Sequence, residues 1–304
     1  MNKGEVTILV NSCDLYEDTW YPFFSLLKMH WPDCPYRIVL NTETKKYDCP
    51  FMNVETINSG SDLSWTARLR YALNQIDSEF VLFFLEDFFL MEKVDDELFF
   101  QAVDLIKSNP KIGRINFMRK RLDDVFTYVP NEVCYFKKID KKGKRRTDVI
   151  ISLWRKDYFL KLLYKDENPW QYEIESDIRS KYAGYDIYTQ RYAVSSPVFH
   201  YCMNPADGIG ITAGKWLKGN RLLFEKYGIE NVNFENLGLF NKEVNYDELN
   251  QEKQNNLINS LKGFAKFKEL VYISIRKFKK RTKLIGIKEL KKHIKYWWYY
   301  KNLK

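Results

Sequence analysis

Short apolar runs alternate with amphipathic segments over the first 118 residues, and this alternation is the feature that most restricts the fold. Strand-like runs occur at 5–12, 36–43, 51–60, 80–90 and 113–119. Between them, apolar residues recur at helical spacing over 18–31, 61–77 and 95–110. Strands that alternate with helices build a parallel sheet with helices on both faces. The sequence therefore predicts an α/β fold with a mostly parallel, Rossmann-like central sheet.

The second half of the chain repeats the alternation less regularly. The polar stretch 120–147 is typical of an exposed hairpin or loop. A strand and a helix are expected over 148–166, a helix over 168–184, a strand over 185–201 and a glycine-rich loop over 206–216. We expect residues 1–240 to form one domain with two halves, about 1–118 and about 148–240. Residues 241–304 are expected to form a helical extension.

Positive charge is concentrated at the C-terminal end. The whole chain carries a net charge of +9. Residues 262–304 hold 15 Lys and Arg against Glu269 and Glu289, so they carry +13 and the rest of the chain about −4. Aromatic residues are interleaved with these basic ones, a pattern that is typical of helices lying on anionic bilayers. A solvated basic helix or a disordered end is the alternative.

The cysteines and the N-terminus bear on location. Five cysteines without a C-x-x-C pair argue against a disulfide framework and against a zinc ribbon. The first ten residues lead directly into a strand-like run, without the apolar segment and cleavage site of a secretory signal. We expect a cytoplasmic protein with reduced thiols, peripheral on the inner face of the cell membrane.

Glu86 and Asp87 stand side by side at the end of the apolar run FVLFFL. An ionised carboxylate among apolar residues needs a compensating partner. One interpretation is structural, with the acids capping a helix or pairing with Arg68 or Arg70. The other is a site for Mg²⁺ or Mn²⁺ and a diphosphate, because these ions favour carboxylate oxygens and ligands bind beyond the carboxyl ends of parallel strands.

Further candidate residues lie on loops and near a helix start. Asp14 follows the first strand, where a nucleoside would lie, or is an ordinary turn residue. His200 is a candidate metal ligand or a structural histidine. Lys215, with Gly208, Gly210 and Gly214, suits a phosphate-covering loop or an ordinary surface loop.

The segment PWQYEIESD supplies a second set of acids. Glu173, beside Trp170 and Tyr172, is a candidate general base, because aromatic surroundings raise the pKa of a carboxyl group. Glu175 and Asp177 are candidates for the same role or for charges at a solvated helix start. Trp170, Tyr172 and Trp65 are candidate substrate contacts, since aromatic faces stack on sugars.

Four stretches resemble bacterial glycosyltransferases of the GT-A fold from capsule and exopolysaccharide clusters. They are NSCDLYEDTWYPFFSLLKMHWPDCPYRIVLNTE, SWTARLRYALNQIDSEFVLFFLEDFF, NPWQYE and GKW. The resemblance, over about 5–240, implies a nucleotide-sugar site in the first half and an acceptor site in the second. It implies a divalent cation at Glu86 and Asp87, with His200 as a later ligand, or Lys215 in place of the ion. It also implies Glu173 as the base. Asp14 and Arg68 are further candidate contacts of the donor nucleotide.

The expected function is transfer of a sugar from a nucleotide-diphosphate sugar, with UDP as the expected nucleotide, to a lipid-linked saccharide acceptor. An inverting displacement with Glu173 as base is expected. Two alternatives remain. A nucleic-acid-binding protein would use the basic aromatic tail, but an acidic site in a body of about −4 argues against nucleic acid. A metal-dependent nucleotidyltransferase would use the same acid pair.

Overall fold

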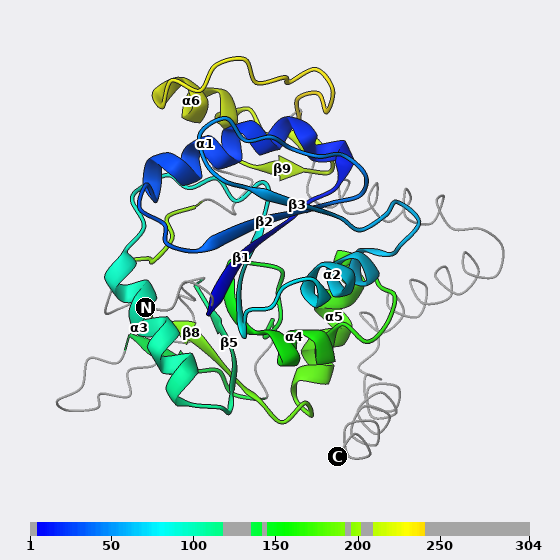
Figure 1. Cartoon of the computed structure of the whole chain (residues 1–304), viewed down its shortest axis with the longest axis vertical. Helices are drawn as coiled ribbons and strands as arrows, with labels where there is room; N and C mark the ends of the chain where they lie inside the picture. The colour runs from blue at the N-terminus through cyan, green and yellow to red at the C-terminus, as the bar shows by residue number, and fades with distance from the viewer. Residues whose placement is uncertain (1–4, 118–134, 142–144, 192–195, 202–208, 241–304) are drawn as a thin grey trace, which may run out of the picture.

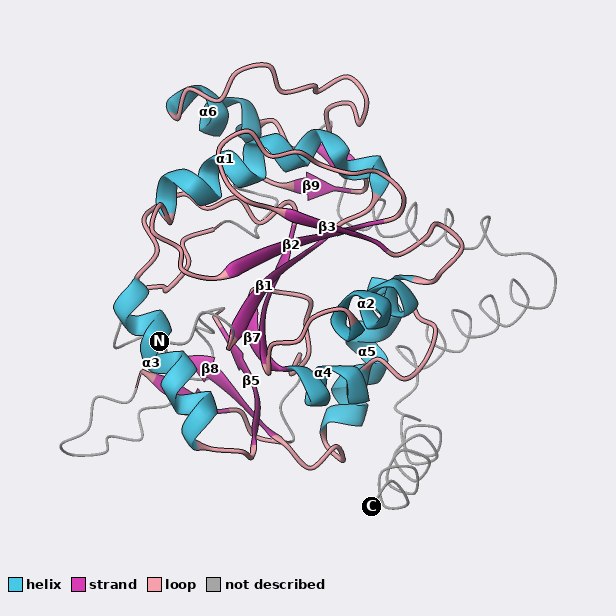
Figure 2. Ribbon diagram, viewed as in Figure 1, coloured by secondary structure: helices cyan, strands magenta, loops and turns pink. Residues whose placement is uncertain are grey.

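A computed structural model describes residues 5–117, 135–141, 145–191, 196–201 and 209–240 of the chain. Its centre is an eight-stranded sheet in the order β3-β2-β1-β4-β7-β5-β8-β6 (Figure 2). The strands are β1 (Val6–Asn11), β2 (Arg37–Thr42), β3 (Glu55–Asn58), β4 (Phe80–Leu85), β5 (Ile112–Asn116), β6 (Phe136–Lys138), β7 (Ser152–Arg155) and β8 (Asp186–Gln190).

The N-terminal half of the sheet is parallel throughout. β1 pairs with β2 on one side and with β4 on the other, so that Leu9 lies opposite Val39 and Phe83. β2 in turn pairs with β3. All six residues of β1 are buried, as is expected of a strand covered on both faces. The predicted α/β class with a mostly parallel sheet is confirmed.

The C-terminal half mixes strand directions. β7 is inserted between β4 and β5 and is antiparallel to both, whereas β5 and β8 are parallel. β6 pairs with β8 in antiparallel fashion, so Phe136–Lys138, within the stretch expected to be an exposed hairpin or loop, is a strand of the central sheet. Arg146 and Thr147 are also fully buried, because tertiary hydrogen bonds compensate their polar groups.

Helices cover both faces of the sheet (Figure 1). Alternation along β1 directs Ile8 and Val10 to one apolar cluster and Leu9 to the other. The first cluster includes side chains of α1 (Trp20–His30), α3 (Asp96–Ser108) and α6 (Gly219–Lys226). The second includes those of α2 (Trp65–Asn74), α4 (Lys156–Leu162) and α5 (Pro169–Ser180).

Short-range signals explain where the main helices begin. α2 follows Ser64, whose hydroxyl accepts the Ala67 N–H and makes Ser64 the N-cap. α5 has Pro169 at its first position and a capping box between Asn168 and Gln171. A 3-10 helix, η1 (Asp14–Thr19), precedes α1.

The glycine-rich segment forms a hairpin of β9 (Ile211–Thr212) and β10 (Lys215–Trp216). Its two turn residues, Ala213 and Gly214, have φ of 52° and 73°, the left-handed values that a two-residue hairpin turn requires. Trp216 is fully buried and stacks on Phe89. The hairpin is therefore anchored to the core just beyond the end of β4.

The predicted helical extension, residues 241–304, lies outside the described residues. Among the residues that are described, no helix combines the length and apolar character that crossing a membrane requires.

Candidate functional site

The order of the strands creates a topological switch point at the end of β1. From β1 the chain continues to β2 and then β3 on one side, and α2 carries it back to β4 on the other. Ligands of open α/β sheets bind where the strand order reverses, beyond the carboxyl ends of the strands. Asn11 lies opposite Leu85 in this register. Ser12 to Asp14 and Glu86 to Asp87 therefore emerge side by side.

The acid pair is buried as it leaves β4. Glu86 is only 6% exposed and Asp87 is half-buried. Burial, followed by the Asp87 charge, raises the pKa of Glu86 well above its usual value, and Arg68 opposes this. Burial also raises the pKa of Asp87 to about 6, although its Oδ2 accepts the Ile211 N–H at 3.2 Å. The two carboxylates are thus poorly compensated by the protein alone.

Arg68, on α2, reaches the same switch point. Its guanidinium is paired with Glu43 at 3.0 Å, and its Nη1 donates to the Ser12 carbonyl at 3.5 Å. The side chain is only 10% exposed, and its Nε has no hydrogen-bond partner among the described residues. The structural interpretation of the acid pair expected Arg68 or Arg70 as ion-pair partner. Arg68 is a charged neighbour of Glu86 but pairs with Glu43, and Arg70 pairs with Asp166.

Asp14 fixes the loop that follows β2. Its carboxylate accepts the N–H groups of Glu43, Thr44 and Lys45 at 3.0 to 3.2 Å and the Thr44 hydroxyl at 2.5 Å. These hydrogen bonds lower the pKa of Asp14 although burial opposes them. In return, the Asp14 N–H donates to Glu43. The structure therefore places Asp14 at the switch point with its carboxylate already engaged, and it positions Glu43 beside Arg68.

The hairpin lies against the acid pair. A Cβ atom on Gly210 would be 3.6 Å from Asp87 Oδ2, and Gly210 has a φ of 99°, so a larger residue would be strained there. The reciprocal bonds between Gly210 and the Asn220 amide, both 2.8 Å, hold the base of the hairpin. Lys215 is exposed on β10. The predicted phosphate-covering loop thus adjoins the switch point, with Lys215 on its solvent side.

The side chain of His200 contacts Glu92 rather than the acid pair. Its Nδ1 is 3.0 Å from Glu92 Oε2, and its carbonyl accepts the Met91 N–H. Within the residues that the structure describes, no group of three or more His, Cys, Asp or Glu side chains is arranged to hold a metal ion. Glu86, Asp87 and His200 are therefore not gathered into a three-ligand set.

Two carboxylates are nevertheless a sufficient protein contribution for Mg²⁺ or Mn²⁺. Mg²⁺ commonly keeps several waters and binds one or two carboxylates together with substrate phosphates. Cys13 has Glu43, Glu86 and Arg68 as charged neighbours, so acids outnumber bases at this point. The surplus negative charge and the raised pKa values of both acids fit a site that a cation completes.

α5 presents the second set of candidates. Glu173 is half-buried and its Oε1 accepts the Val149 N–H at 2.8 Å. Burial raises the pKa of Glu173, and the Asp148 charge adds to this, whereas the Val149 N–H and Arg114 lower it. Trp170 is 55% exposed on the same helix. Glu173 and Trp170 are therefore both accessible from one side of α5.

The remaining aromatic candidates lie deeper. Tyr172 is buried, and its ring centroid is 5.5 Å from that of Trp65 on α2. Trp65 is half-buried, as is Glu175. This contact packs α2 against α5, so Tyr172 and Trp65 connect the two halves.

The two sets of acids lie at the same end of the sheet, the end at which the parallel strands β1 and β4 finish. Because β7 is antiparallel to β4, Ser152 lies opposite Phe83, and residues 149–151 emerge beside Glu86. The ring centroids of Phe88 and Tyr201 are 5.3 Å apart, and Tyr201 has Arg114 and Asp148 as charged neighbours. Glu173, bound to Val149, is thus at the edge that carries the acid pair.

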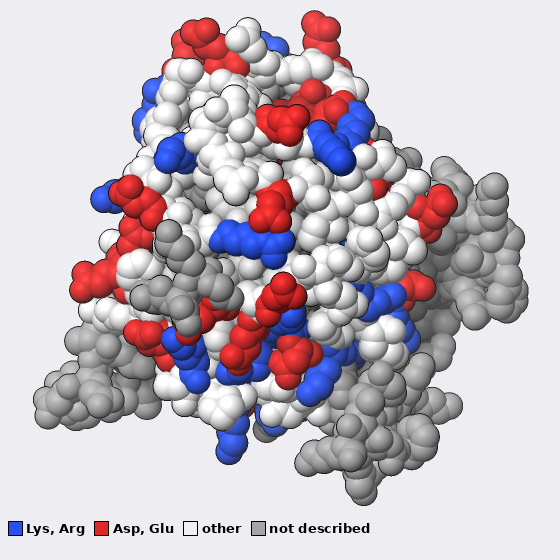
Figure 3. All heavy atoms as spheres, in the orientation of Figure 1, with Lys and Arg blue, Asp and Glu red and all other residues white. Residues whose placement is uncertain are grey.

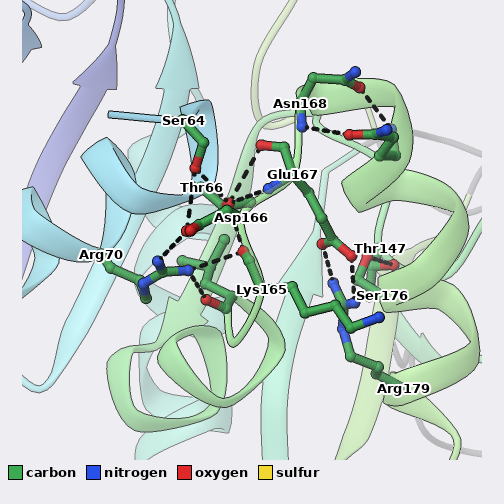
Figure 4. Close-up of polar contacts among 12 residues, drawn as sticks. Ser64, Thr66, Arg70, Thr147, Lys165, Asp166, Glu167, Asn168, Ser176 and Arg179 are labelled. Carbon is green, nitrogen blue, oxygen red and sulfur yellow. Dashed lines mark hydrogen bonds and ion pairs between the residues drawn. The ribbon is translucent and has the colours of Figure 1, made fainter. Parts of the chain in front are cut away.

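Segment 165–168 fastens α2 to α5 behind this edge (Figure 4). On the α2 side, the Thr66 hydroxyl bonds to the Lys165 carbonyl and the Glu167 N–H, and Arg70 pairs with Asp166. On the α5 side, both oxygens of Glu167 bind the Arg179 guanidinium, at 2.7 and 2.5 Å. The segment therefore fixes the helix that carries Arg68 relative to the helix that carries Glu173.

Sequence reasoning missed several residues of this site. Glu43 and Tyr16 join the switch point only through loop contacts, and no local pattern marks them. Arg114 did carry a signal, because an arginine within the apolar strand Ile112–Asn116 must have buried partners. Ile211 contributes a main-chain N–H, which side-chain chemistry does not reveal.

Ionisation of Asp87 is expected to destabilise the fold as pH rises. A folded-state pKa of about 6, against an ordinary 3.8, means that the native state binds more protons than the unfolded chain between these values. The free energy of unfolding then falls with rising pH over this interval. From pH 4 to pH 7 we expect the wild type to lose about 2 kcal/mol more than Asp87→Asn. Urea unfolding in EDTA measures this, and equal losses would contradict it.

Comparison with known proteins gives only distant likenesses. No family model matches the chain, and no curated protein matches it. Among solved structures, S. aureus TarS has a TM-score of 0.44 at 12% identity over 84% of this chain, which spans only 43% of that protein. TarS 1-349 in complex with UDP-GlcNAc has a TM-score of 0.39 at 11% identity, covering 96% of this chain and 79% of that one.

A cytidylyltransferase from Leptospira borgpetersenii is similar to a comparable degree. Its TM-score is 0.42 at 11% identity, over 86% of this chain and 99% of that one. Likenesses of this size identify neither a family nor an activity. The function of the chain must be inferred from its own residues.

Proposed function

We propose that the chain is a GT-A-type glycosyltransferase that moves a sugar from a nucleotide-diphosphate sugar to an acceptor hydroxyl. One observation carries this proposal: the buried guanidinium of Arg68, whose Nε has no hydrogen-bond partner in the part of the chain that the structure describes, lies near the undercompensated acids Glu86 and Asp87 at the β1–β4 switch point. Guanidinium groups bind phosphates, and carboxylates hold the cations that accompany diphosphates. The base candidate Glu173 lies at the same edge of the sheet.

The chemistry is a single displacement. Glu173 accepts the proton of the acceptor hydroxyl as its oxygen forms a bond to the anomeric carbon of the donor. The bond from that carbon to the diphosphate oxygen breaks, and the nucleoside diphosphate leaves with the electron pair. Arg68 offers Nε–H to the departing charge, with Lys215 as the further cationic candidate. A divalent ion held by Glu86 and Asp87 would supply charge neutralisation at the diphosphate.

The acceptor is proposed from the second half of the chain and from its tail. Trp170 offers an exposed ring next to Glu173, suited to stacking on a sugar. Residues 262–304 combine basic and aromatic residues and suit an anionic bilayer surface. We therefore propose a lipid-linked saccharide as acceptor, used at the cytoplasmic face of the membrane, with UDP as the nucleotide of the donor.

Nucleic acid is not a favoured ligand. In Figure 3, acidic and basic side chains of the described residues are interspersed on the face shown rather than gathered into a basic stripe. The switch point itself is acidic.

A thermal-shift screen of nucleoside diphosphates and nucleotide sugars, with and without Mn²⁺, tests the donor site. We expect at least one nucleotide to raise the melting temperature, because a ligand at 100 times its Kd stabilises the native state by about 2.7 kcal/mol. Asp87→Asn is expected to weaken the Mn²⁺-dependent part and Arg68→Met the nucleotide itself. Stabilisation by none of the nucleotides would contradict the proposal.

Matched variants and products sharpen this screen. Arg37→Met removes an arginine at the start of β2, at the opposite end of the strands, where it pairs with Glu55. This variant should leave nucleotide binding unchanged. The released product separates the two transferase chemistries. Sugar transfer liberates a nucleoside diphosphate, whereas nucleotidyl transfer from a triphosphate liberates pyrophosphate, and pyrophosphate as the sole product would favour the nucleotidyltransferase alternative.

Deletion of 262–304 is expected to abolish binding to vesicles that contain anionic lipid, because each basic residue near such a surface contributes about 1 kcal/mol. Co-sedimentation at low and high salt measures this, and high salt should weaken binding of the full chain. Uncharged vesicles serve as the control. Undiminished binding of the truncated chain to anionic vesicles would contradict the proposed role of the tail.

A further inference from the structure

Arg114 is a fully buried guanidinium whose hydrogen bonds to other described residues all go to neutral groups. Its nitrogens donate to the Arg146 carbonyl at 2.6 Å, the Asp148 carbonyl at 2.6 Å and the Ser152 hydroxyl at 2.7 and 3.0 Å. The group lies 4.5 Å from the centre of the Trp154 ring. Among the described residues, no carboxylate lies within ion-pair distance of it, whereas the buried arginines Arg155 and Arg179 each have one.

A buried guanidinium charge is energetically unfavourable in a protein core. A buried ionised group costs several kcal/mol unless it is compensated, and an apolar side chain of similar size packs as well. Carbonyl and hydroxyl oxygens accept the hydrogen bonds of Arg114, and the carboxylates of Asp148 and Glu173 act on its charge only from beyond ion-pair distance, so packing alone does not explain its presence. What the guanidinium does specifically is to fix the main chain at 146–148.

That stretch of main chain is bonded along its length to one face of α5. The Val149 N–H donates to Glu173 Oε1 at 2.8 Å. Three further contacts follow at helical spacing along α5: the Thr147 and Ser176 hydroxyls at 2.6 Å, Arg146 N–H to Asp177 Oδ1 at 2.7 Å, and Arg146 Nε to the Ser180 hydroxyl at 3.0 Å. Residues 173, 176, 177 and 180 lie on one face of a helix. Arg114 thus holds the carbonyl groups of the segment that bonds to this polar face of α5.

Glu173 differs from the two serines of this face in its exposure. Ser176 and Ser180 are fully buried, whereas Glu173 is half-buried near the exposed Trp170. In the described part of the chain, the one hydrogen bond from another residue to its carboxylate is that from Val149, on Oε1. Its Oε2 is therefore left to accept a proton.

We propose that Arg114 is a positioning residue for Glu173: by holding the Arg146 and Asp148 carbonyls it fixes the Val149 N–H, which orients the Glu173 carboxylate. The positioning itself rests on contacts within the chain, and only its use in sugar transfer rests on the proposed function.

The charges around Glu173 make this measurable. Burial and the Asp148 charge raise its pKa, while the Val149 hydrogen bond and the charges of Arg114 and Arg145 lower it. Removing Arg114 takes away one lowering charge and loosens the hydrogen bond that supplies another lowering effect. The pKa of Glu173 should therefore rise when Arg114 is replaced, since its ionised form loses support.

Titration of Glu173 in the full chain tests the proposal. The Glu173 carboxyl carbon is followed by ¹³C NMR and assigned by its loss in Glu173→Gln. In Arg114→Met we expect the pKa to rise by about one unit, a tenfold change in proton affinity. Arg155→Met is the matched control. Arg155 is a buried guanidinium on β7 that donates to the Ile106 and Ile112 carbonyls near the opposite edge, so its loss should leave the Glu173 titration unchanged.

The pH dependence of sugar transfer gives a second readout that loss of stability alone would not move. In Arg114→Met the acidic limb should shift upward by the same unit, with nucleotide affinity within about twofold of wild type. Arg114→Lys, which keeps the charge but not the fork of bonds, should give a smaller shift and guards against a Met variant that does not fold. A Glu173 pKa equal to that of wild type in either folded variant would overturn the proposal.

The two readouts separate this proposal from the proposed function. The titration needs no substrate, so a raised Glu173 pKa in a chain that turns over no nucleotide sugar supports the positioning and counts against glycosyl transfer. A raised pKa with an unshifted pH profile of active enzyme would overturn the role of Arg114 in the reaction.

Discussion

Glu173→Gln is expected to lower the rate of sugar transfer by about 10²- to 10⁴-fold, the contribution of a positioned general base. Glutamine is nearly isosteric and its amide oxygen can still accept the Val149 N–H, so the fold should be preserved. Donor affinity should change by less than about twofold, because Glu173 acts on the acceptor. Single-turnover transfer and a nucleotide-binding isotherm on the same sample measure the two quantities.

The neighbouring acids of α5 provide controls for this result. Glu175→Gln tests the other candidate base, which is half-buried on the same helix. Asp177→Ala removes the oxygen that accepts the Arg146 N–H at 2.7 Å, so it should affect stability more than turnover. A larger loss of transfer in Glu175→Gln than in Glu173→Gln would reassign the base.

Arg179→Met is expected to destabilise the fold by about 3–5 kcal/mol, because it leaves the Glu167 carboxylate buried without its partner. The exposed fractions of the two side chains are 0% and 6%, and both carboxylate oxygens are bound. This pair fastens segment 165–168 to α5. Urea unfolding at pH 7, followed by tryptophan fluorescence, measures the loss.

The adjacent Arg70–Asp166 pair is the matched control. Asp166 is 71% exposed, and an exposed ion pair contributes only about 0–1 kcal/mol, so Asp166→Ala should cost little. The double variant Arg179→Met, Glu167→Leu should recover much of the lost stability, since no uncompensated charge remains. A loss below 1 kcal/mol in Arg179→Met would show that water reaches Glu167.

Local patterns were enough to predict the α/β class and most elements of the first 117 residues. Apolar runs such as FVLFFL specify buried strands, and Ser64, Asp95 and Pro169 mark helix starts, because capping and proline geometry act over three or four residues. That Phe136–Lys138 joins the central sheet was not predicted. A short polar strand at the sheet edge gains its hydrogen bonds from β8, about fifty residues away in sequence.

The candidate site shows the same division. Glu86 and Asp87 could be predicted as site residues from their position after an apolar run, and Glu173 from its aromatic neighbours. The hydrogen-bond and ion-pair partners of the site residues could not be predicted. Glu43 reaches Arg68 across two loops, Ile211 reaches Asp87 from 124 residues away, and Val149 holds Glu173. These contacts depend on how separate elements meet, which periodicity does not encode.

By itself, the sequence determined the elements of this protein, the carboxyl-terminal position of its acid pair and the separation of a basic tail from a mildly acidic body. The reason is that burial, capping and charge are properties of neighbouring residues. Only the tertiary structure decided that β7 runs antiparallel between β4 and β5, that Asp14 is engaged by the loop that follows β2, and that Arg114 braces the main chain that holds Glu173. A buried charge takes its role from the groups around it, and here those groups come from distant parts of the chain.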